Sequence, residues 1–187
     1  MTRGLVRSAL VCALWWSSIP AATAAAAEDI SIVVRAQGSG FEVDARATLD
    51  VPVELVWRTL TDYGRLAQFI PGLESSRVVG REGATAFVEQ KGRAGYWFLY
   101  WPIDVTLVST ERPPNAIDVH LVSGNLRRLD GGYRLSVVDG RVVLAWSGIL
   151  EPEFRLPRFV EERVIASNVT AQFKGMVDEI ERRHGLR

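Results

Sequence analysis

The carboxylate of Glu162 interrupts the apolar stripe of a helix that the sequence predicts from Leu156 to His184. At 100° per residue, the apolar side chains that recur along this segment fall within about 80° of one another. This stripe is predicted to face the rest of the domain. Its other members are Phe159, Ala166, Val169, Phe173, Val177 and Ile180.

Burying an unpaired carboxylate costs several kcal/mol, so Glu162 on such a face must be paired, protonated or solvated by a cavity. Facing a cavity, it is a candidate catalytic acid or base and a candidate ligand contact. The alternative is an exposed carboxylate on the first turn, where the helix dipole favours an anion. Both interpretations stay open.

The run from Tyr96 to Trp101 is the densest aromatic segment and points to the binding of a ring-shaped or isoprenoid ligand. A strand with one buried face alternates apolar and polar residues, and this run does not. Trp97 lies on one face, and Phe98 and Tyr100 lie on the other. Which face lines a cavity is open, and core packing or a surface for a partner protein or bilayer are the alternatives. These three residues are candidate ligand contacts.

Each of the other polar and aromatic candidate residues has both a structural and a functional interpretation. Tyr63 ends the first predicted helix or closes the mouth of a pocket, and Trp146 packs in the core or forms part of a ligand wall. His120 is predicted on the solvated face of a strand, with a role as general base as the alternative. Of Arg127 and Arg128, one is expected in solvent, and the other binds an acidic ligand head or pairs with the helix carboxylate.

The sequence shows no Ser-His-Asp ordering that stands out, no metal-ligand spacing and no glycine-rich phosphate loop. We therefore expect no metal and no cofactor. The 22 basic residues equal the 22 acidic ones, and two of the basic residues lie in the N-terminal segment. Without a basic excess, nucleic acid is not an expected partner.

Residues 1–27 have the composition of a cleaved signal peptide, with an uncleaved anchor as the alternative. Arg3 and Arg7 precede an apolar stretch from Ala9 to Ile19, and alanines before Glu28 offer cleavage sites. The only cysteine, Cys12, lies in this segment, so the mature chain can form no disulfide. We expect one domain over residues 28–187, in the periplasm or secreted.

The remaining chain alternates like a series of strands joined by short turns, which predicts an antiparallel sheet. A helix over Pro52 to Tyr63 and a second short piece ending at Pro71-Gly72 precede most of the strands. With the long terminal helix, these elements make an α+β domain. The predicted strands are Ile30–Ala36, Phe41–Leu49, Ser76–Arg81, Thr85–Lys91, Gly95–Thr110, Ala116–Ser123, Gly131–Val138 and Arg141–Leu150.

Two motifs resemble those of a known superfamily. The segment Pro52-x-Glu54-x-Val56-Trp57-x-x-Leu60-Thr61-Asp62-Tyr63, followed by Phe69-x-Pro71, is similar to the opening helix of the START-like (SRPBCC) superfamily. The segment from Gly124 to Tyr133 resembles the sheet motif of its coenzyme Q-binding and polyketide cyclase/dehydrase branch. The resemblance implies a helix-grip fold, in which a curved antiparallel sheet wraps a long C-terminal helix around a deep pocket.

Three functions are consistent with this resemblance. The first is a periplasmic carrier that holds a lipid, quinone or polyketide-like molecule between sheet and helix. The second is a polyketide cyclase or dehydratase that uses the same pocket. The third is an envelope interaction module with an apolar lip at Val160 and Val164, in transient contact with the membrane or an envelope protein. The alternative for these two valines is packing under the loop from Leu150 to Leu156. We expect a monomer.

Overall fold

The computed structural model describes residues 30–96, 99–153 and 157–185. The expected signal peptide and the candidates Trp97 and Phe98 lie outside these ranges. The elements, in chain order, are β1 (Ser31–Gln37), β2 (Gly40–Leu49), α1 (Val53–Leu60), the 3-10 helix η1 (Tyr63–Gln68), β3 (Leu73–Glu82), β4 (Thr85–Tyr96), β5 (Leu99–Arg112), β6 (Ala116–Gly124), β7 (Leu126–Val138), β8 (Arg141–Pro152) and α2 (Arg158–Gly185).

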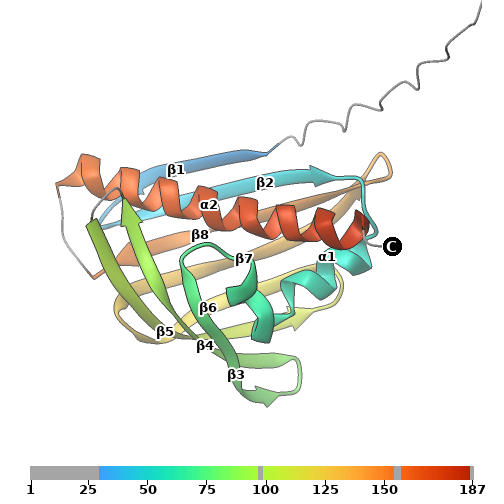
Figure 1. Cartoon of the computed structure of the whole chain (residues 1–187), viewed down its shortest axis with the longest axis horizontal. Coiled ribbons are helices and arrows are strands. Elements are labelled where there is room, and N and C mark those ends of the chain that lie inside the picture. Colours follow the sequence, from blue (N-terminus) through green and yellow to red (C-terminus); the bar gives the residue numbers. More distant parts are fainter. Residues whose placement is uncertain (1–29, 97–98, 154–156, 186–187) are drawn as a thin grey trace, which may run out of the picture.

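The strands form one antiparallel sheet in the order β1-β2-β8-β7-β6-β5-β4-β3 (Figure 1). Short turns join most neighbouring strands. The pairing of β2 with β8 places one of the first strands of the chain beside the last one. Between β7 and β8, Asp139 and Gly140 have φ of 51° and 77°. Positive φ at both central residues is the geometry of a two-residue hairpin turn. The predicted antiparallel α+β fold is confirmed.

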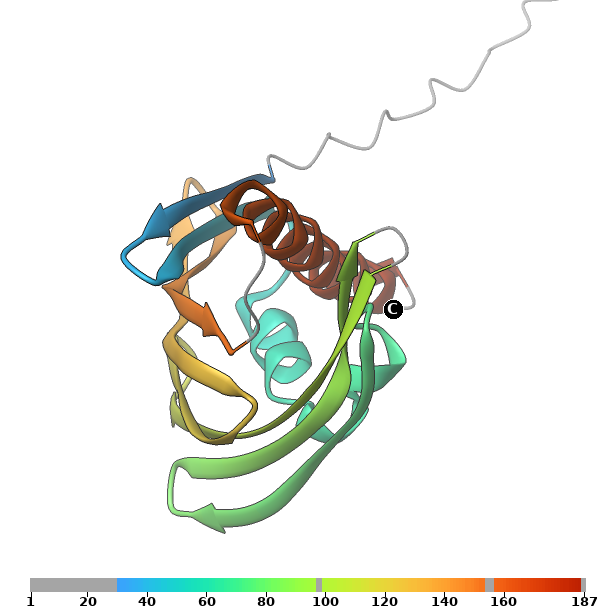
Figure 2. The same cartoon turned by 90° about the vertical axis from the view of Figure 1, so that its left-hand side faces the viewer.

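The sheet curls beneath α2, and α1 lies within the curve at its far end (Figure 2). Strand β2 shows how the pattern dictates this: Val43, Ala45, Ala47 and Leu49 are buried on the concave face, whereas Arg46 is exposed. Side chains alternate across a strand, so one strand supplies both the core and the wet outer face. The closed end of the core combines Leu49, Val56, Leu144, Val177 and Ile180.

Close backbone contact and an ion network hold the C-terminal half of α2 in place. A Cβ atom on Gly175 would lie 2.6 Å from Cδ of Pro71, so only glycine permits the helix to approach this loop so closely. The buried carboxylate of Glu179 accepts hydrogen bonds from Arg182 and Arg183. Arg183 also donates to Asp62 at 2.9 Å, which ties the helix to the end of α1.

The inner face of α2 differs from the predicted stripe in the first half of the helix. Val177 and Ile180 are fully buried as predicted, but the buried apolar residues near the start are Val164 and Ile165. Glu162 is exposed. A straight helix that crosses a twisted, curved sheet presents a face that turns along its length, so one stripe cannot describe both halves. No helix in the described ranges is long and apolar enough to cross a membrane.

Candidate functional site

A cavity of about 260 Å³ lies between the concave face of the sheet and α2. Strands β2–β8 supply its floor and sides, η1 and the loop after it supply one wall, and α2 closes it. Most lining side chains are apolar. Those from the sheet include Val43, Ala45, Leu73, Val88, Ala94, Ile103, Val105, Leu107, Ile117, Val119, Leu126, Leu129, Trp146, Ile149, Leu150 and Pro152.

Tyr63 and Ser109 are hydroxyl-bearing residues in the wall contributed by η1 and β5. The Tyr63 hydroxyl is sealed from the cavity and finds no well-oriented hydrogen-bond partner in the described part of the chain. Burial, and secondly the Glu111 carboxylate, raise the pKa of this phenol. The guanidinium of Arg81 lies 5.8 Å from the centre of the Tyr63 ring and pairs with Glu111. Tyr63 therefore remains a neutral phenol.

Tyr133 is a second phenol in the wall, on the inward face of β7. Its ring packs edge-on against Trp146, with ring centres 4.7 Å apart and planes at 61°. Burial raises the pKa of Tyr133 to about 12, so this phenol also stays protonated at physiological pH. The side chain of Tyr133 is only partly buried, whereas the hydroxyl of Tyr63 is fully buried.

Asn168 connects α2 to the sheet at the edge of the cavity. Its side-chain nitrogen donates to the Gly95 carbonyl at 2.8 Å, and its oxygen accepts from the Gly95 backbone N–H at 3.2 Å. The same nitrogen donates to the Val164 carbonyl. Pairing between β3 and β4 ends at Leu73 and Gly92, so the outer edge of β4 beyond that point needs another partner. The Asn168 amide takes the place of a strand there.

The structure places four of the predicted ligand contacts in the cavity wall: Tyr63, Trp146, Val169 and Phe173. Tyr63 lies within the cavity wall rather than in the terminal turn of a helix, because it begins η1. Trp146 belongs both to the wall and to the packed core. The two predicted interpretations of Trp146 are therefore compatible.

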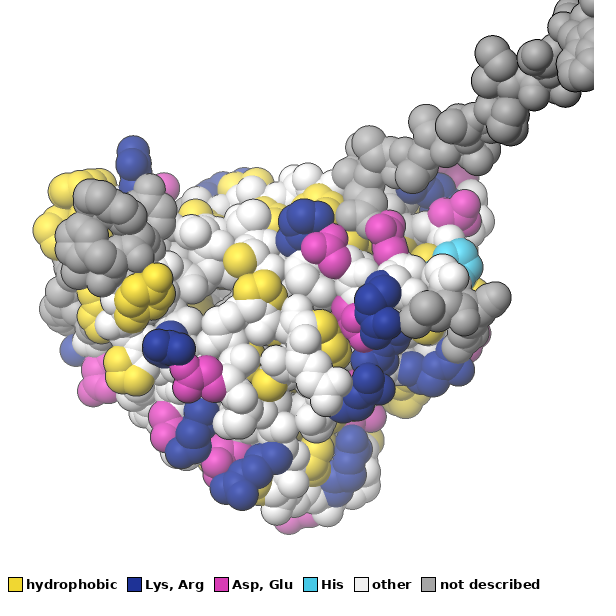
Figure 3. Space-filling view, in the orientation of Figure 1, with side chains coloured by type: hydrophobic (Ala, Val, Ile, Leu, Met, Phe, Trp, Pro, Cys, Tyr) yellow, Lys and Arg dark blue, Asp and Glu magenta, His cyan; other side chains and the backbone are white. Residues whose placement is uncertain are grey.

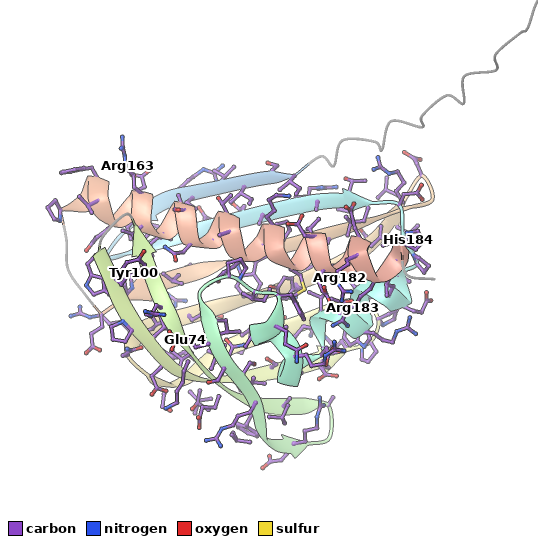
Figure 4. All side chains as sticks on the ribbon, in the orientation of Figure 1. Glu74, Tyr100, Arg163, Arg182, Arg183 and His184 are labelled. Atoms are coloured by element: carbon purple, nitrogen blue, oxygen red, sulfur yellow. The ribbon has the colours of Figure 1, made fainter. Side chains whose placement is uncertain are left out.

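Tyr100, Phe159, Glu162 and Ala166 do not line the cavity, so their choice as ligand contacts is wrong. For Glu162, the alternative of an exposed carboxylate on the first turn agrees with the structure. Tyr100 is 63% exposed because its parity on β5 points to the outer face, opposite Ile103 and Val105. Phe159 is 68% exposed because the first turns of α2 face inward through other residues. Hydrophobic side chains gather at this end of the molecule (Figure 3), where Figure 4 labels Tyr100.

The charged candidates form pairs away from the cavity. Arg127 lies 3.8 Å from Glu151, and Arg128 lies 3.0 Å from Asp130, so neither pairs with Glu162. His120 is exposed on β6 and contacts Asp130 at 3.0 Å, as its predicted position on the solvated face requires. Val164 is fully buried, so the predicted apolar lip of Val160 and Val164 is wrong for that residue.

The wall residues that were not among the predicted contacts include Ser109, Tyr133 and Asn168. Tyr133 belongs to the sheet motif from Gly124 to Tyr133 and lies on the same face of its strand as Leu135. This alternation could have indicated that Tyr133 points inward. Asn168 carried no such signal, because its partner is a backbone group distant in sequence. Among the described residues, no three His, Asp or Glu side chains come close enough to hold a metal ion.

A family model described as polyketide cyclase/dehydrase and lipid transport matches residues 49–173. The chain therefore belongs to this family and to the START-like superfamily that contains it. No curated protein sequence matches the chain.

Solved structures share the fold at low sequence identity. A STAR-related lipid transfer protein from Xanthomonas axonopodis is 14% identical, with a TM-score of 0.65 over 84% of this chain and 97% of that one. The ZhuI aromatase/cyclase from a Streptomyces species is 17% identical, with a TM-score of 0.61 over 76% and 94%. Human StAR-related lipid transfer protein 5 is 10% identical, with a TM-score of 0.64 over 82% and 88%. At these identities the likeness concerns the fold alone.

Proposed function

We propose that the protein binds a hydrophobic small molecule, such as a lipid, quinone or polyketide-like compound, between the sheet and α2 and carries it. The observation behind this proposal is the enclosed, mainly apolar wall of the cavity. Moving apolar ligand surface from water into such a wall contributes about 25 cal/mol per Å². The volume of about 260 Å³ lies just below the roughly 300–1,000 Å³ of drug-sized sites. A small ligand fits best.

Filling the cavity tests this function. Val119 points from β6 into the cavity, whereas Val122 on the same strand is 54% exposed on the outer face. We expect Val119→Trp to weaken binding of the neutral apolar dye N-phenylnaphthylamine at least about tenfold, because the indole takes up ligand space. Val122→Trp is the matched control and should bind like the wild type. Equal binding by all three proteins, with folding checked by circular dichroism, would contradict binding in this cavity.

A cyclase or dehydratase is the second candidate. The observation in its favour is that Ser109 and Tyr133 bring hydroxyl-bearing side chains to a mainly apolar wall. Orientation alone accelerates intramolecular ring closure strongly, so a shaped cavity needs little further chemistry. Purified protein incubated with an acyl carrier-bound polyketide chain should then change the product distribution, and Val119→Trp should abolish the change. An identical distribution with and without the wild-type protein would exclude this activity for that chain.

We also propose that the protein works in the periplasm. The charge and hydropathy pattern of residues 1–27 supports export. Fractionation of the producing cell, followed by determination of the mature N-terminus, tests this. Protein found only in the cytoplasm with Met1 or Thr2 at its N-terminus would contradict it.

A further inference from the structure

The hydroxyl of Tyr133 is a polar group in the cavity wall that the protein itself does not use. No residue in the described part of the chain forms a hydrogen bond with the Tyr133 hydroxyl, and the ring is held by Trp146. Leaving a buried hydroxyl without a partner costs about 1–3 kcal/mol. Because Tyr133 lines the cavity and is only partly buried, a molecule in the cavity can supply the missing partner.

Apart from Ser109 and Gln172, the other polar side chains in the wall are committed to the protein or closed off. Arg93 pairs with Glu74. The Asn168 amide bonds with Gly95 and Val164. Gln90 contacts Ser76 at 3.4 Å. The hydroxyl of Tyr63 is sealed by its neighbours. Tyr133 differs from these residues, because its donor is both unpaired and reachable.

The floor beside Tyr133 is shaped for a flat group. In the register of β7 and β8, Tyr133 lies opposite Trp146, and Gly131 lies opposite Gly148. A Cβ atom on Gly148 would lie 2.7 Å from the Cα atom of Gly131, so neither strand can carry a side chain there. A Cβ atom on Gly131 would also lie 3.1 Å from Cζ2 of Trp146, so the indole covers Gly131, whereas the bare backbone of Gly148 lines the cavity beside the aromatic pair.

From this arrangement we infer that the bound molecule carries a flat ring with an oxygen acceptor, and that the Tyr133 hydroxyl donates a hydrogen bond to that oxygen. The inference rests on the proposed binding function and specifies its ligand class. The ring lies over Gly148 beside Trp146, and the oxygen faces the phenol. Because the phenol stays protonated, it acts as a donor throughout the physiological pH range.

A matched pair of ligands tests this. Acetylnaphthalene and isopropenylnaphthalene have the same shape and differ only in an oxygen in place of a methylene group. We expect Tyr133→Phe to weaken binding of the ketone about three- to tenfold and to leave binding of the alkene unchanged, as measured by displacement of N-phenylnaphthylamine. Tyr100→Phe, the same change on an exposed tyrosine, should alter neither affinity.

Infrared spectroscopy supplies a second readout that does not depend on affinity. The carbonyl band of the bound ketone should lie at lower frequency in the wild type than in Tyr133→Phe, because a hydrogen bond weakens the C=O bond. An equal effect of Tyr133→Phe on both ligands, or an unshifted band in the wild type, would overturn the inference while leaving the binding function intact. Failure of the wild type to bind either ligand or the dye would overturn the proposed function and this inference with it.

Discussion

The two halves of α2 face different surroundings. The C-terminal half packs against α1 and the loop after η1, and it combines fully buried Val177 and Ile180 with the ion network of Glu179. The N-terminal half borders the cavity through Ile165, Val169 and other residues, and a side-chain amide ties it to the sheet. Figure 4 labels Arg182 and Arg183 at one end of the helix and Arg163 at the other.

This contrast separates stability from binding along one helix. Beyond Met176, none of the described residues of α2 lines the cavity, so this closely packed end of the helix supports the fold. At the N-terminal half, the side chains that line the cavity lack van der Waals partners on one side, and a bound ligand can supply them. Regions that bind and open are commonly the less stable parts of a protein. Substitutions in the two halves should therefore have different consequences.

The largest effect is expected from removing core volume at the C-terminal half. Ile180 is fully buried, and Ile180→Ala should lower the free energy of unfolding by about 2–5 kcal/mol, because it leaves a void among packed neighbours. Dye affinity of the folded fraction should stay unchanged. Ile165→Ala is the counterpart beside the cavity and should cost less stability while altering dye affinity. Urea unfolding measures the stability of each variant, and dye titration measures its affinity. If Ile180→Ala and Ile165→Ala changed stability and dye affinity equally, the two halves of the helix would not differ in function.

Acid should loosen the C-terminal half selectively. Hydrogen bonds from Arg182, opposed by burial and assisted by Arg183, lower the pKa of Glu179 from 4.5 to about 2. Because the folded pKa is depressed, the contribution is complete above pH 4.5 and is lost as the pH falls towards about 2. It amounts to about 3 kcal/mol at most.

Glu179→Gln should remove this part of the pH dependence of unfolding between those two pH values. Glu162→Gln, a change to an exposed carboxylate on the same helix, is the control and should leave the profile as it is. Identical profiles for the wild type and both variants would mean that the network does not stabilise the fold.

The smallest effect on stability is expected from the amide at the N-terminal half. Asn168→Ala frees both polar groups of Gly95 at a sheet edge and should cost about 1–2 kcal/mol. Its main consequence should be a faster release of the dye, since the seam between α2 and β4 opens more readily. Stopped-flow displacement measures this rate, with Ser167→Ala, at an exposed neighbour, as control. An unchanged release rate would show that ligand does not leave by this seam.

The architecture was predictable because it rests on local signals. Alternation in Phe41–Leu49, the Asp139-Gly140 turn and the long terminal helix each follow from residue type and spacing. The inward face of α2 near Glu162 was not predictable, since it depends on how the curved sheet turns beneath the helix. The face of the sheet to which Tyr100 points likewise depends on the position of β5 in the sheet. For these reasons the sequence predicted an apolar pocket between the sheet and the helix, but it did not predict the polar contacts in that pocket.

The central claim is that the cavity between the sheet and α2 holds a hydrophobic small molecule. Native mass spectrometry of the protein, isolated from the producing cells without detergent, tests it most directly. We expect the wild type and Val122→Trp to carry a bound, extractable mass, and we expect this mass to be missing from Val119→Trp. A wild-type protein that repeatedly carries nothing, or a Val119→Trp protein that carries the same mass, would contradict it.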